Sequence, residues 1–574
     1  MTRTVTLTAV VGTLLAIVTT ACAGGPAAVR LWDTVTPVRA EAELAARAGW
    51  RAFPAGVPEG DLVVETDALT VTFAAHLGKV LMAGKADPRL TTELRPTELL
   101  GKQATLALAV AERDGRPTIR AAFRAADGGE SAIMLSLTSD RILAIVPEEA
   151  TRAVALSAPI EVAIVPSILG EDLIYDPKDY PAAQMLSLPS EHFLIGLLRG
   201  ENSMLVATWQ EEAPAVRLLL DHGGDHAIGA VNLAEARGLS LALLEAPGIW
   251  HRQSLGPSML ERDIAIGWRP PFPAIWLTQL LEDEVKTTFE FREGRDRQWR
   301  GSVGYYDYPV YFSRGETMLS LGKKIPPEGD AIIYFLERSD DTPVEPPSPI
   351  DVAQRTLNGD VLAGILEVEG RPAWFPERPN AVLGAATCAV TDALKEIFDA
   401  GQEVEKRELV RGGVEDMYFY LEHMQERDAR FPVFARDMLS YLDAQQQAAP
   451  ELAAYLNEMR GIAQEIVDTY DHARDTIRDM KYAHELGDRT IALAAERRPD
   501  NPQRMADLKQ DWTGMGGALE HLACREHTLT RKLYQQAAYL AATNPAAMPV
   551  AEEIRRRAKR CLAKPESYEI WANY

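Results

Sequence analysis

TPVEPPSPI, residues 342–350, divides this chain into two halves of different character. Four of its nine residues are proline, so the segment is expected to be stiff and extended, as inter-domain linkers often are. Ser348 followed by Pro349 is typical of a helix start, with serine as the N-cap and proline in the first turn. The sequence therefore predicts a domain boundary at residues 341–350 and a helix that begins there.

Residues 61–340, which precede this boundary, consist of short apolar runs separated by Gly, Pro, Asp and Asn. Examples are LVVE at 62–65, LTVTF at 69–73, ATLALAV at 104–110, TIRAAF at 118–123 and AIMLSL at 132–137. Many short strands at this spacing favour antiparallel sheets over βαβ units. We expect a large β-sandwich-type region, because about 280 residues are enough for two packed sandwiches or one oversized one.

Residues 351–574, which follow the boundary, carry helical periodicity. Apolar side chains recur in alternating steps of four and three, the spacing of a coiled-coil seam, at Leu452, Leu456, Met459, Ala463, Ile466, Tyr470, Ala473, Ile477 and Met480. A second seam begins after Pro502. We predict a helix from Glu451 to Arg498 that is about 70 Å long, within an elongated antiparallel helical bundle. The fold class is therefore expected to be α+β and multidomain.

The composition limits the classes of partner. The 574 residues include 60 Lys and Arg against 83 Asp and Glu, a formal net charge of −23. A chain this acidic repels nucleic acid, which we exclude as the main partner, whereas local arginine clusters still allow an anionic ligand. Four cysteines are too few for a disulfide scaffold; Cys524 and Cys561 remain open to either pairing or burial as thiols.

Residues 1–25, MTRTVTLTAVVGTLLAIVTTACAGG, combine one arginine, an apolar run and small residues. This pattern is that of a secretory signal. It resembles a bacterial lipoprotein signal, although Thr19 stands where such signals carry an aliphatic residue. The resemblance implies that Cys22 is the lipidated first residue of an envelope lipoprotein, with the lipid as its one membrane contact. Cleavage as A-x-A at Ala21-Cys22-Ala23 would instead give a secreted or periplasmic protein. Residues 26–60 form a lead-in.

Residues 267–312, here called the aromatic segment, concentrate aromatic and arginine side chains within the β-rich half. Flat aromatic faces suit the apolar C–H faces of sugar rings, and arginine suits carboxylate or sulfate. The alternative interpretation is a β-sheet core, because Trp and Tyr also favour strands. The candidate ligand-binding residues are Trp268, Arg269, Trp276, Trp299, Tyr305, Tyr306, Tyr308 and Tyr311.

His251 and Arg252 follow Trp250 in GIWHRQS, upstream of the aromatic segment. A polysaccharide lyase must neutralise a uronate carboxylate and abstract the neighbouring proton, and Arg, His and Tyr suit that work. If the protein is an enzyme, we expect His251, Arg252 and Tyr306 to be its catalytic residues, in a polysaccharide lyase or glycoside hydrolase. The alternative for His251 is a histidine at the end of a strand with no catalytic role.

Two polar stretches contain candidate metal ligands. His222, Asp225 and His226 flank a Gly-Gly hairpin turn and have donor atoms that suit Zn or Mn, but a hairpin tip offers no surrounding support for a metal, which favours a solvated polar turn. GEDLIYDPKDYP, residues 170–181, offers carboxylates for calcium, but its spacing favours an acidic surface loop. The chain lacks HExxH, paired CxxC, GxSxG, GxGxxG and Walker motifs, so we expect no cofactor.

The sequence as a whole favours an exported cell-envelope or extracellular protein that binds a glycan or polysaccharide through the β-region. The helical half would serve as a spacer or as a docking surface for a protein partner. The first alternative is the lyase or glycoside hydrolase acting at the same surface. The second is a structural envelope protein without a small ligand, for which the long helices are the main argument.

Overall fold

A computed structural model describes the chain outside the following ranges: 1–28, 40–48, 114–115, 150, 152, 167–171, 211–214, 222–226, 260–262, 266–267, 269–276, 283–286, 294–296, 300–305, 308–309, 313–328, 339–346, 359–366, 369–370, 373–403, 475–479, 496–501 and 563–574. For the strands between residues 263 and 312, the backbone alone is described. The signal segment and Cys22 therefore lie outside the described residues. No helix within the described ranges is long and apolar enough to span a membrane.

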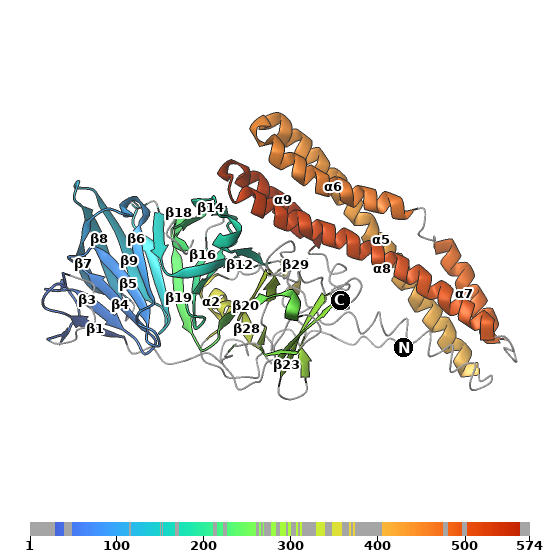
Figure 1. The fold of residues 1–574 in the computed structure, drawn as a ribbon, viewed down its shortest axis with the longest axis horizontal. Helices are drawn as coiled ribbons and strands as arrows, with labels where there is room; N and C mark the ends of the chain where they lie inside the picture. The colour runs from blue at the N-terminus through green and yellow to red at the C-terminus, as the bar shows by residue number, and fades with distance from the viewer. Residues whose placement is uncertain are drawn as a thin grey trace, which may run out of the picture. The chain divides into compact units, whose positions relative to one another are not determined.

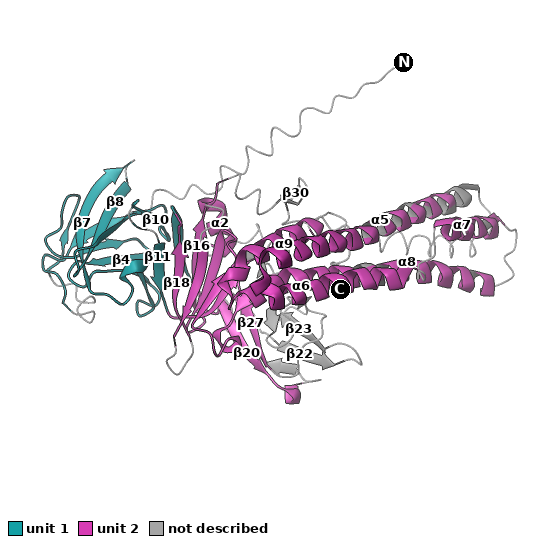
Figure 2. Ribbon diagram, turned by 90° about the horizontal axis from the view of Figure 1, so that it is seen from above, with its two compact units in different colours: residues 1–158, 237–244 teal, residues 159–236, 245–574 magenta. Residues whose placement is uncertain are grey.

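The chain forms two compact units, and the division falls inside the β-rich half (Figure 2). Unit 1 contains residues 1–158 and 237–244, and unit 2 contains residues 159–236 and 245–574. The chain thus leaves unit 1, builds part of unit 2, returns for one strand and then completes unit 2. In this division the helices belong to the same unit as the later strands, and the domain boundary expected at residues 341–350 stays a prediction.

Unit 1 is built from antiparallel strands. They are β1 (Arg30–Asp33), β2 (Arg51–Ala52), β3 (Leu62–Glu65), β4 (Leu69–Ala74), β5 (Lys79–Gly84), β6 (Thr91–Pro96), β7 (Ala104–Arg113), β8 (Arg116–Ala125), β9 (Glu130–Leu137), β10 (Ile142–Pro147), β11 (Ala153–Ser157) and β19 (Leu239–Glu245). One run of neighbours is β1–β3–β4–β5–β6–β11, and another is β7–β8–β9–β10–β19. The expected strand pattern is confirmed here.

Alternation within these strands decides which residues form the core of unit 1. In β7, Leu106, Leu108 and Val110 are buried, while the alanines between them lie on the more exposed face. This period of two is what an antiparallel sheet with one covered face requires. The lead-in is attached to the core by Asp33, which is buried and accepts hydrogen bonds from the N–H groups of Val35 and Gly60 at 2.8 and 2.9 Å.

The strands of unit 2 are also antiparallel. They are β12 (Ile160–Val165), β13 (Leu173–Tyr175), β14 (Met185–Leu188), β15 (Phe193–Leu198), β16 (Ser203–Trp209), β17 (Ala215–Leu220), β18 (Ile228–Ala234), β20 (Trp250–Leu255), β21 (Asp263–Ala265), β22 (Leu277–Glu282), β23 (Thr287–Glu293), β24 (Arg297–Trp299), β25 (Tyr306–Asp307), β26 (Val310–Phe312), β27 (Gly329–Tyr334), β28 (Glu337–Arg338), β29 (Glu367–Val368) and β30 (Arg371–Pro372). Strand neighbours are β13–β12–β15–β16, β18–β17–β14, β20–β27–β26 and β21–β22–β23–β24.

In the sequence, β20 precedes the aromatic segment and β27 follows it. Their register runs from Trp250 opposite Tyr334 to Leu255 opposite Gly329. Residues 256–328, here called the excursion, therefore leave and re-enter at one end of this two-strand ladder. Strands β21 to β26 belong to the excursion, and two of them pair with strands outside it, β26 with β27 and β25 with β28.

The helices of unit 2 follow these strands. They are α2 (Pro349–Thr356), α5 (Val404–Ala448), α6 (Ala453–Arg474), α7 (Met480–Ala495), α8 (Pro502–Ala541) and α9 (Met548–Leu562). The predicted helix start at the proline-rich segment is confirmed. Ser348 Oγ accepts from Asp351 N–H at 3.0 Å, and the Asp351 carboxylate accepts from Ser348 N–H at 2.7 Å, which forms a capping box.

Helices α5 and α8 run in the same direction (Figure 1). Their N-terminal portions share one apolar cluster through Met417 of α5 and Trp512 of α8, and their C-terminal portions share another through Met438 and Leu533. Helix α6 contributes to the second cluster and α7 to the first. Within the predicted helix Glu451–Arg498 the structure describes α6, Ala453–Arg474, and α7, Met480–Ala495; residues 475–479 lie outside the described residues, so the continuity of that helix stays a prediction.

The C-terminal end of α8 is attached to the strands of unit 2. Tyr539 Oη accepts a hydrogen bond from Ile174 N–H of β13 at 2.9 Å, and the Ala542 carbonyl accepts from Ser187 N–H of β14 at 2.7 Å. Arg555 of α9 is buried and donates to Glu191, between β14 and β15, at 2.9 Å. The first two contacts satisfy backbone N–H groups of β13 and β14 that would otherwise be open to pairing with another chain. The chain is an α+β protein with extensive antiparallel β-structure and several helices.

One cysteine expectation can be compared with the structure. Cys561 of α9 is buried, forms no disulfide and packs beside Phe431, Ile466 and Leu529. A disulfide with Cys524 is therefore absent, and the thiol contributes to the apolar core as a small hydrophobic side chain.

Candidate functional site

The candidate site lies on β20 and its neighbours in unit 2. Strand β20 places His251 and Arg252 next to each other, so their side chains leave the strand on opposite sides. Trp250 anchors the start of the strand, since its indole N–H donates to the Leu198 carbonyl at 2.8 Å in the buried core. The two residues that were expected to act together are thus fixed to one rigid strand.

His251 is held by Glu201, in the turn between β15 and β16. The Nδ1 atom of His251 lies 2.9 Å from Oε2 of Glu201, and Oε1 of Glu201 accepts from Arg252 N–H at 3.0 Å. Loss of water around Glu201 would raise its pKa. The hydrogen bonds from His251 and Arg252 outweigh that effect and hold the pKa below its usual value. The ionised carboxylate favours the histidine tautomer whose proton is on Nδ1.

The far side of the His251 ring is enclosed. The ring stacks on Trp268 with centroids 6.2 Å apart and planes inclined by 13°. Its Nε2 atom is buried and has no hydrogen-bond partner, which is uncommon for an interior polar atom. A histidine oriented by a carboxylate, with Nε2 bearing a lone pair, is the arrangement of a general base. Because Nε2 is covered in this structure, it is not accessible to a substrate.

Arg252 bridges two carboxylates. Its Nη1 atom donates to Asp176 Oδ2 at 2.7 Å and to Asp330 Oδ2 at 3.0 Å. Ser254 and Lys178 add further hydrogen bonds to Asp330, at 2.9 and 3.3 Å. The Arg252 side chain is 14% exposed and that of Asp176 is 4% exposed, so this ion pair is largely removed from water. We call Asp176, Arg252 and Asp330, with their partners Ser254 and Lys178, the Arg252 node.

The chemistry of the Arg252 node is that of a structural cross-link. Loss of water disfavours the charged guanidinium, but the charges and hydrogen bonds of Asp176 and Asp330 outweigh this and raise the pKa of Arg252. A lyase arginine must instead present its positive charge to the substrate carboxylate. Arg252 is already neutralised by two carboxylates of the protein, so it does not offer that charge.

Tyr306, the third candidate catalytic residue, lies in β25, where its backbone pairs with Arg338 of β28. Its side chain is outside the described part of the structure. The structure thus brings His251 and Arg252 together with Glu201, and leaves the role of Tyr306 as a prediction.

The candidate ligand-binding residues are distributed over several elements. Trp268 is 5% exposed, and its indole N–H donates to the Gly248 carbonyl at 2.7 Å, so it is a core residue in this structure. Trp299 lies in β24, Tyr306 in β25 and Tyr311 in β26. Arg269, Trp276, Tyr305 and Tyr308 lie outside the described residues.

The candidate metal residues His222, Asp225 and His226 also lie outside the described residues. Among the residues that are described, no group of three or more His, Cys, Asp or Glu side chains is arranged to hold a metal ion.

The expected acidic surface loop at residues 170–181 is wrong for two of its carboxylates. Asp172 is buried and accepts a hydrogen bond from the Tyr334 hydroxyl, and Asp176 is buried in the Arg252 node. Asp176 also accepts from Lys178 N–H at 3.1 Å and so caps a short 3-10 helix. The Asp-Pro-Lys sequence is a typical cap signal that could have identified this residue. Glu201 and Asp330 had no comparable local signal.

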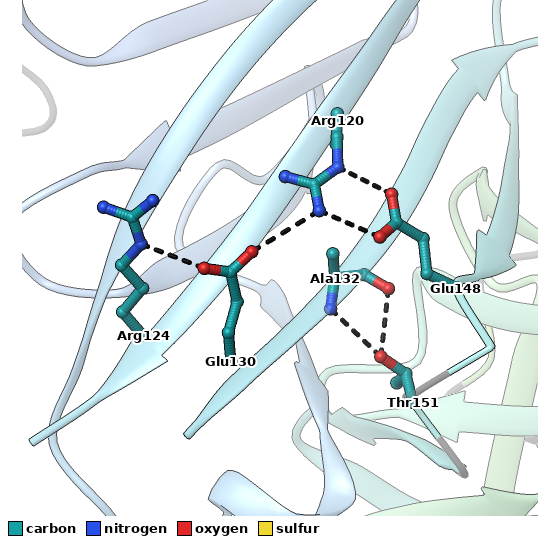
Figure 3. Close-up of polar contacts among 6 residues, drawn as sticks. All are labelled: Arg120, Arg124, Glu130, Ala132, Glu148 and Thr151. Atoms are coloured by element: carbon teal, nitrogen blue, oxygen red, sulfur yellow. Dashed lines mark hydrogen bonds and ion pairs between the residues drawn. The ribbon is translucent and has the colours of Figure 1, made fainter. Parts of the chain in front are cut away.

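Unit 1 has an ion-pair network of similar composition on β8 and β9 (Figure 3). Arg120 donates to both oxygens of Glu148, at 2.6 and 2.9 Å, and its Nη2 lies 3.5 Å from Glu130. Arg124 donates to the other oxygen of Glu130 at 3.1 Å. Thr151 closes the adjacent turn through hydrogen bonds to the backbone of Ala132. These charged side chains are 36–60% exposed, so the network is solvated.

We compared the chain with protein-family models and with curated proteins, and neither comparison gives a match. The protein is therefore classified by its fold class alone, antiparallel strands combined with helices. Its function must be inferred from the sites themselves.

Proposed function

We propose that this chain is an exported cell-envelope or extracellular protein that binds carbohydrate through the sheet β21–β24 of the excursion. In this proposal the β-region is of sandwich type, and the helices form an elongated bundle that acts as a spacer or as a docking element for a protein partner. The signal-like residues 1–25 support export, and the aromatic segment supports the ligand class.

The observation that carries the proposal is the register of β23 with β24. Phe291 is the cross-strand partner of Trp299, and Phe291 is also the partner of Thr278 in β22. Directly opposed residues of an antiparallel sheet have neighbouring side chains on one face. Two opposed aromatic residues on a short sheet suit the apolar face of a sugar ring, provided that the face is open to solvent.

The same hairpin suggests an acidic glycan. Arg297, the partner of Glu293, is two positions from the aromatic pair and shares its face of the sheet, whereas Arg292, the partner of Gln298, belongs to the other face. Guanidinium groups recognise carboxylate or sulfate with two parallel hydrogen bonds. A uronic-acid-containing oligosaccharide is therefore the probe that we would test first.

The enzyme alternative is supported by one observation, the Glu201–His251 pair in which Nε2 of His251 is buried and has no hydrogen-bond partner. Against it stands Arg252, which is occupied by Asp176 and Asp330. A lyase or glycoside hydrolase would therefore need another residue to neutralise a uronate. The structural alternative rests on the length of α5 and α8, which have 45 and 40 residues.

The proposal is tested with the chain from residue 26 to residue 574. Binding to a glycan array and formation of unsaturated or reducing ends are measured in parallel. We expect binding without products, and weaker binding in Trp299→Ala and Phe291→Ala. Tyr470→Ala, which removes a half-buried tyrosine of α6, is the matched control and should bind as the unmodified chain does.

Each other outcome rejects a specific part of the proposal. Products that disappear in His251→Ala would establish the enzyme alternative. Unchanged binding in Trp299→Ala would remove β24 from the site. Absence of both binding and products would leave the structural alternative.

A further inference from the structure

The excursion leaves and re-enters at the end of the β20–β27 ladder, and it is also joined to the rest of unit 2 where β26 pairs with β27 and β25 pairs with β28. Leu255 and Gly329, which are cross-strand partners, are the last ladder residues before the excursion begins and after it ends. We call residues 252–255 and 329–332 the neck. Among the described strands, β21 to β24 pair only with one another, so the neck, from which the chain enters β21, contributes to the position of that sheet.

The Arg252 node lies on the neck. Ser254 and Asp330 are cross-strand partners, and Ser254 Oγ donates to Asp330 Oδ1 at 2.9 Å. Arg252, two residues before Ser254, donates to the other oxygen of Asp330 at 3.0 Å. One aspartate thus receives hydrogen bonds from two residues of the facing strand, which holds the two strands of the neck together at their open end.

The same arginine joins the neck to the rest of unit 2. Asp176, its second partner, follows β13 and caps the 3-10 helix Pro177–Asp179. Four residues earlier, Asp172 accepts a hydrogen bond from Tyr334 at the other end of β27. Segment 172–176 is therefore attached to β27 at one end through Tyr334 and at the neck through Arg252.

A second attachment acts on β20 from the opposite side. Glu201 accepts from Arg252 N–H and lies 2.9 Å from His251 Nδ1. Glu201 itself has a φ of 65°, a left-handed conformation that is unfavourable for a residue other than glycine. Such a strained conformation is maintained only when several surrounding contacts hold it in place. The turn, β20 and segment 172–176 therefore constrain one another.

We propose that Arg252 is a positioning residue for glycan binding: its ion pairs with Asp176 and Asp330 hold the neck in one geometry, so that β21–β24 is presented to the ligand in one orientation. This inference rests on the proposed function. It replaces the role first expected for Arg252, direct contact with a uronate, because both of its carboxylate partners belong to the protein.

The test compares Arg252→Gln, Arg252→Lys and Arg120→Gln with the unmodified chain of residues 26–574. Arg120→Gln is the matched control, since Arg120 also bridges two carboxylates but lies in unit 1. Hydrogen exchange is measured for peptides that cover the neck. Binding of hexagalacturonate, a linear uronic-acid hexasaccharide, is measured by calorimetry.

We expect neck amides to exchange about tenfold faster in Arg252→Gln, which corresponds to about 1.4 kcal/mol of lost local protection. Hexagalacturonate should bind about tenfold more weakly. Arg252→Lys retains the charge but not the planar fork, so it should lie between the two. Arg120→Gln should match the unmodified chain in both measurements.

The outcomes separate this inference from the proposed function. If Arg252→Gln exchanges at the neck as the unmodified chain does, the positioning role is wrong. If the neck loosens but hexagalacturonate binds equally well, the link between the neck and binding is wrong. If the unmodified chain binds no glycan on the array, the proposed function fails, while the exchange rates still decide whether Arg252 holds the neck.

Discussion

Arg252 and Arg120 each bridge two carboxylates, yet they occupy different environments. The Arg252 side chain is 14% exposed and that of Arg120 is 38% exposed. In the solvated network around Arg120, water stabilises each charge when its partner is removed, so the loss in the free energy of unfolding is small. In the Arg252 node, removal of the arginine leaves buried carboxylates without compensation. Comparison of the two shows that burial, rather than the number of ion pairs, decides how strongly such a network constrains the chain.

The largest expected effect is that of Arg252→Gln on the stability of unit 2. Asp176 and Asp330 would remain charged and largely buried, and we expect a loss of about 3 kcal/mol in the free energy of unfolding. Urea denaturation, followed by hydrogen exchange in peptides of unit 2, measures this. A loss below about 1 kcal/mol would mean that Arg252 behaves as a surface arginine, and the comparison with Arg120 would fail.

Acidification should reduce the difference in stability between the unmodified chain and Arg252→Gln. Loss of water would raise the pKa of Asp330, but hydrogen bonds from Arg252 and Ser254 outweigh it and leave the pKa below its usual value. The stabilisation is thus complete above the pKa of the unfolded chain, about 3.9, and is lost as the pH falls through the lower folded pKa. The stability gap between the unmodified chain and Arg252→Gln should shrink from pH 6 to about pH 3. A constant gap would exclude Asp330 as the partner that matters.

The carboxyl group of Asp179, next to the Arg252 node, should have the opposite effect on stability: it should destabilise the folded state as the pH rises. Loss of water around its carboxyl group is the main cause that raises its pKa to about 6, and the negative charge of Asp176 adds to it. The residue as a whole nevertheless remains exposed. The folded state therefore binds this proton more tightly than the unfolded chain, and stability falls as the pH rises from about 4 to about 6.

Asp179→Asn removes that penalty. The variant should be more stable than the unmodified chain at pH 7, by less than about 1 kcal/mol because the residue is exposed, and equally stable near pH 4. Thermal unfolding at the two pH values measures this. A variant that is less stable at pH 7 would show that the ionised carboxylate is favourable there.

The smallest expected effect is that of Arg120→Gln in unit 1. Removal of its pairs with Glu148 and Glu130 should cost less than about 1 kcal/mol, and the cost should fall further at 1 M salt, where surface charges are screened. Denaturant unfolding of unit 1 at low and high salt measures both quantities. A loss equal to that of Arg252→Gln would remove the distinction between the two arginines.

The strands and the helix start were predictable because their signals are local. Runs such as LVVE at 62–65 coincide with β3, and Ser348 with Pro349 marks the start of α2, because alternation and capping involve neighbouring residues. The seam after Leu452 is local too, and it runs through both α6 and α7. Heptad spacing shows which face of a helix is apolar, but it does not show which other helices pack against that face.

The candidate site was predictable in part. His251 and Arg252 were identified from their residue types, but their partners were not, because Arg252 reaches Asp176 and Asp330 across 76 and 78 residues and His251 reaches Glu201 across 50. No periodicity in the sequence records such contacts. Without these carboxylates, Arg252 resembles a ligand-binding residue; with them, it is a cross-link.

The attachment of α8 and α9 to the strands has a consequence for how unit 2 acquires its structure. Ile174 is 365 residues from Tyr539, and Glu191 is 364 residues from Arg555. Strands β13 and β14 are therefore made long before the groups that satisfy their edges. During synthesis these edges remain open to pairing with other chains until nearly the whole protein is available, so unit 2 has a high contact order and cannot complete its folding one segment at a time.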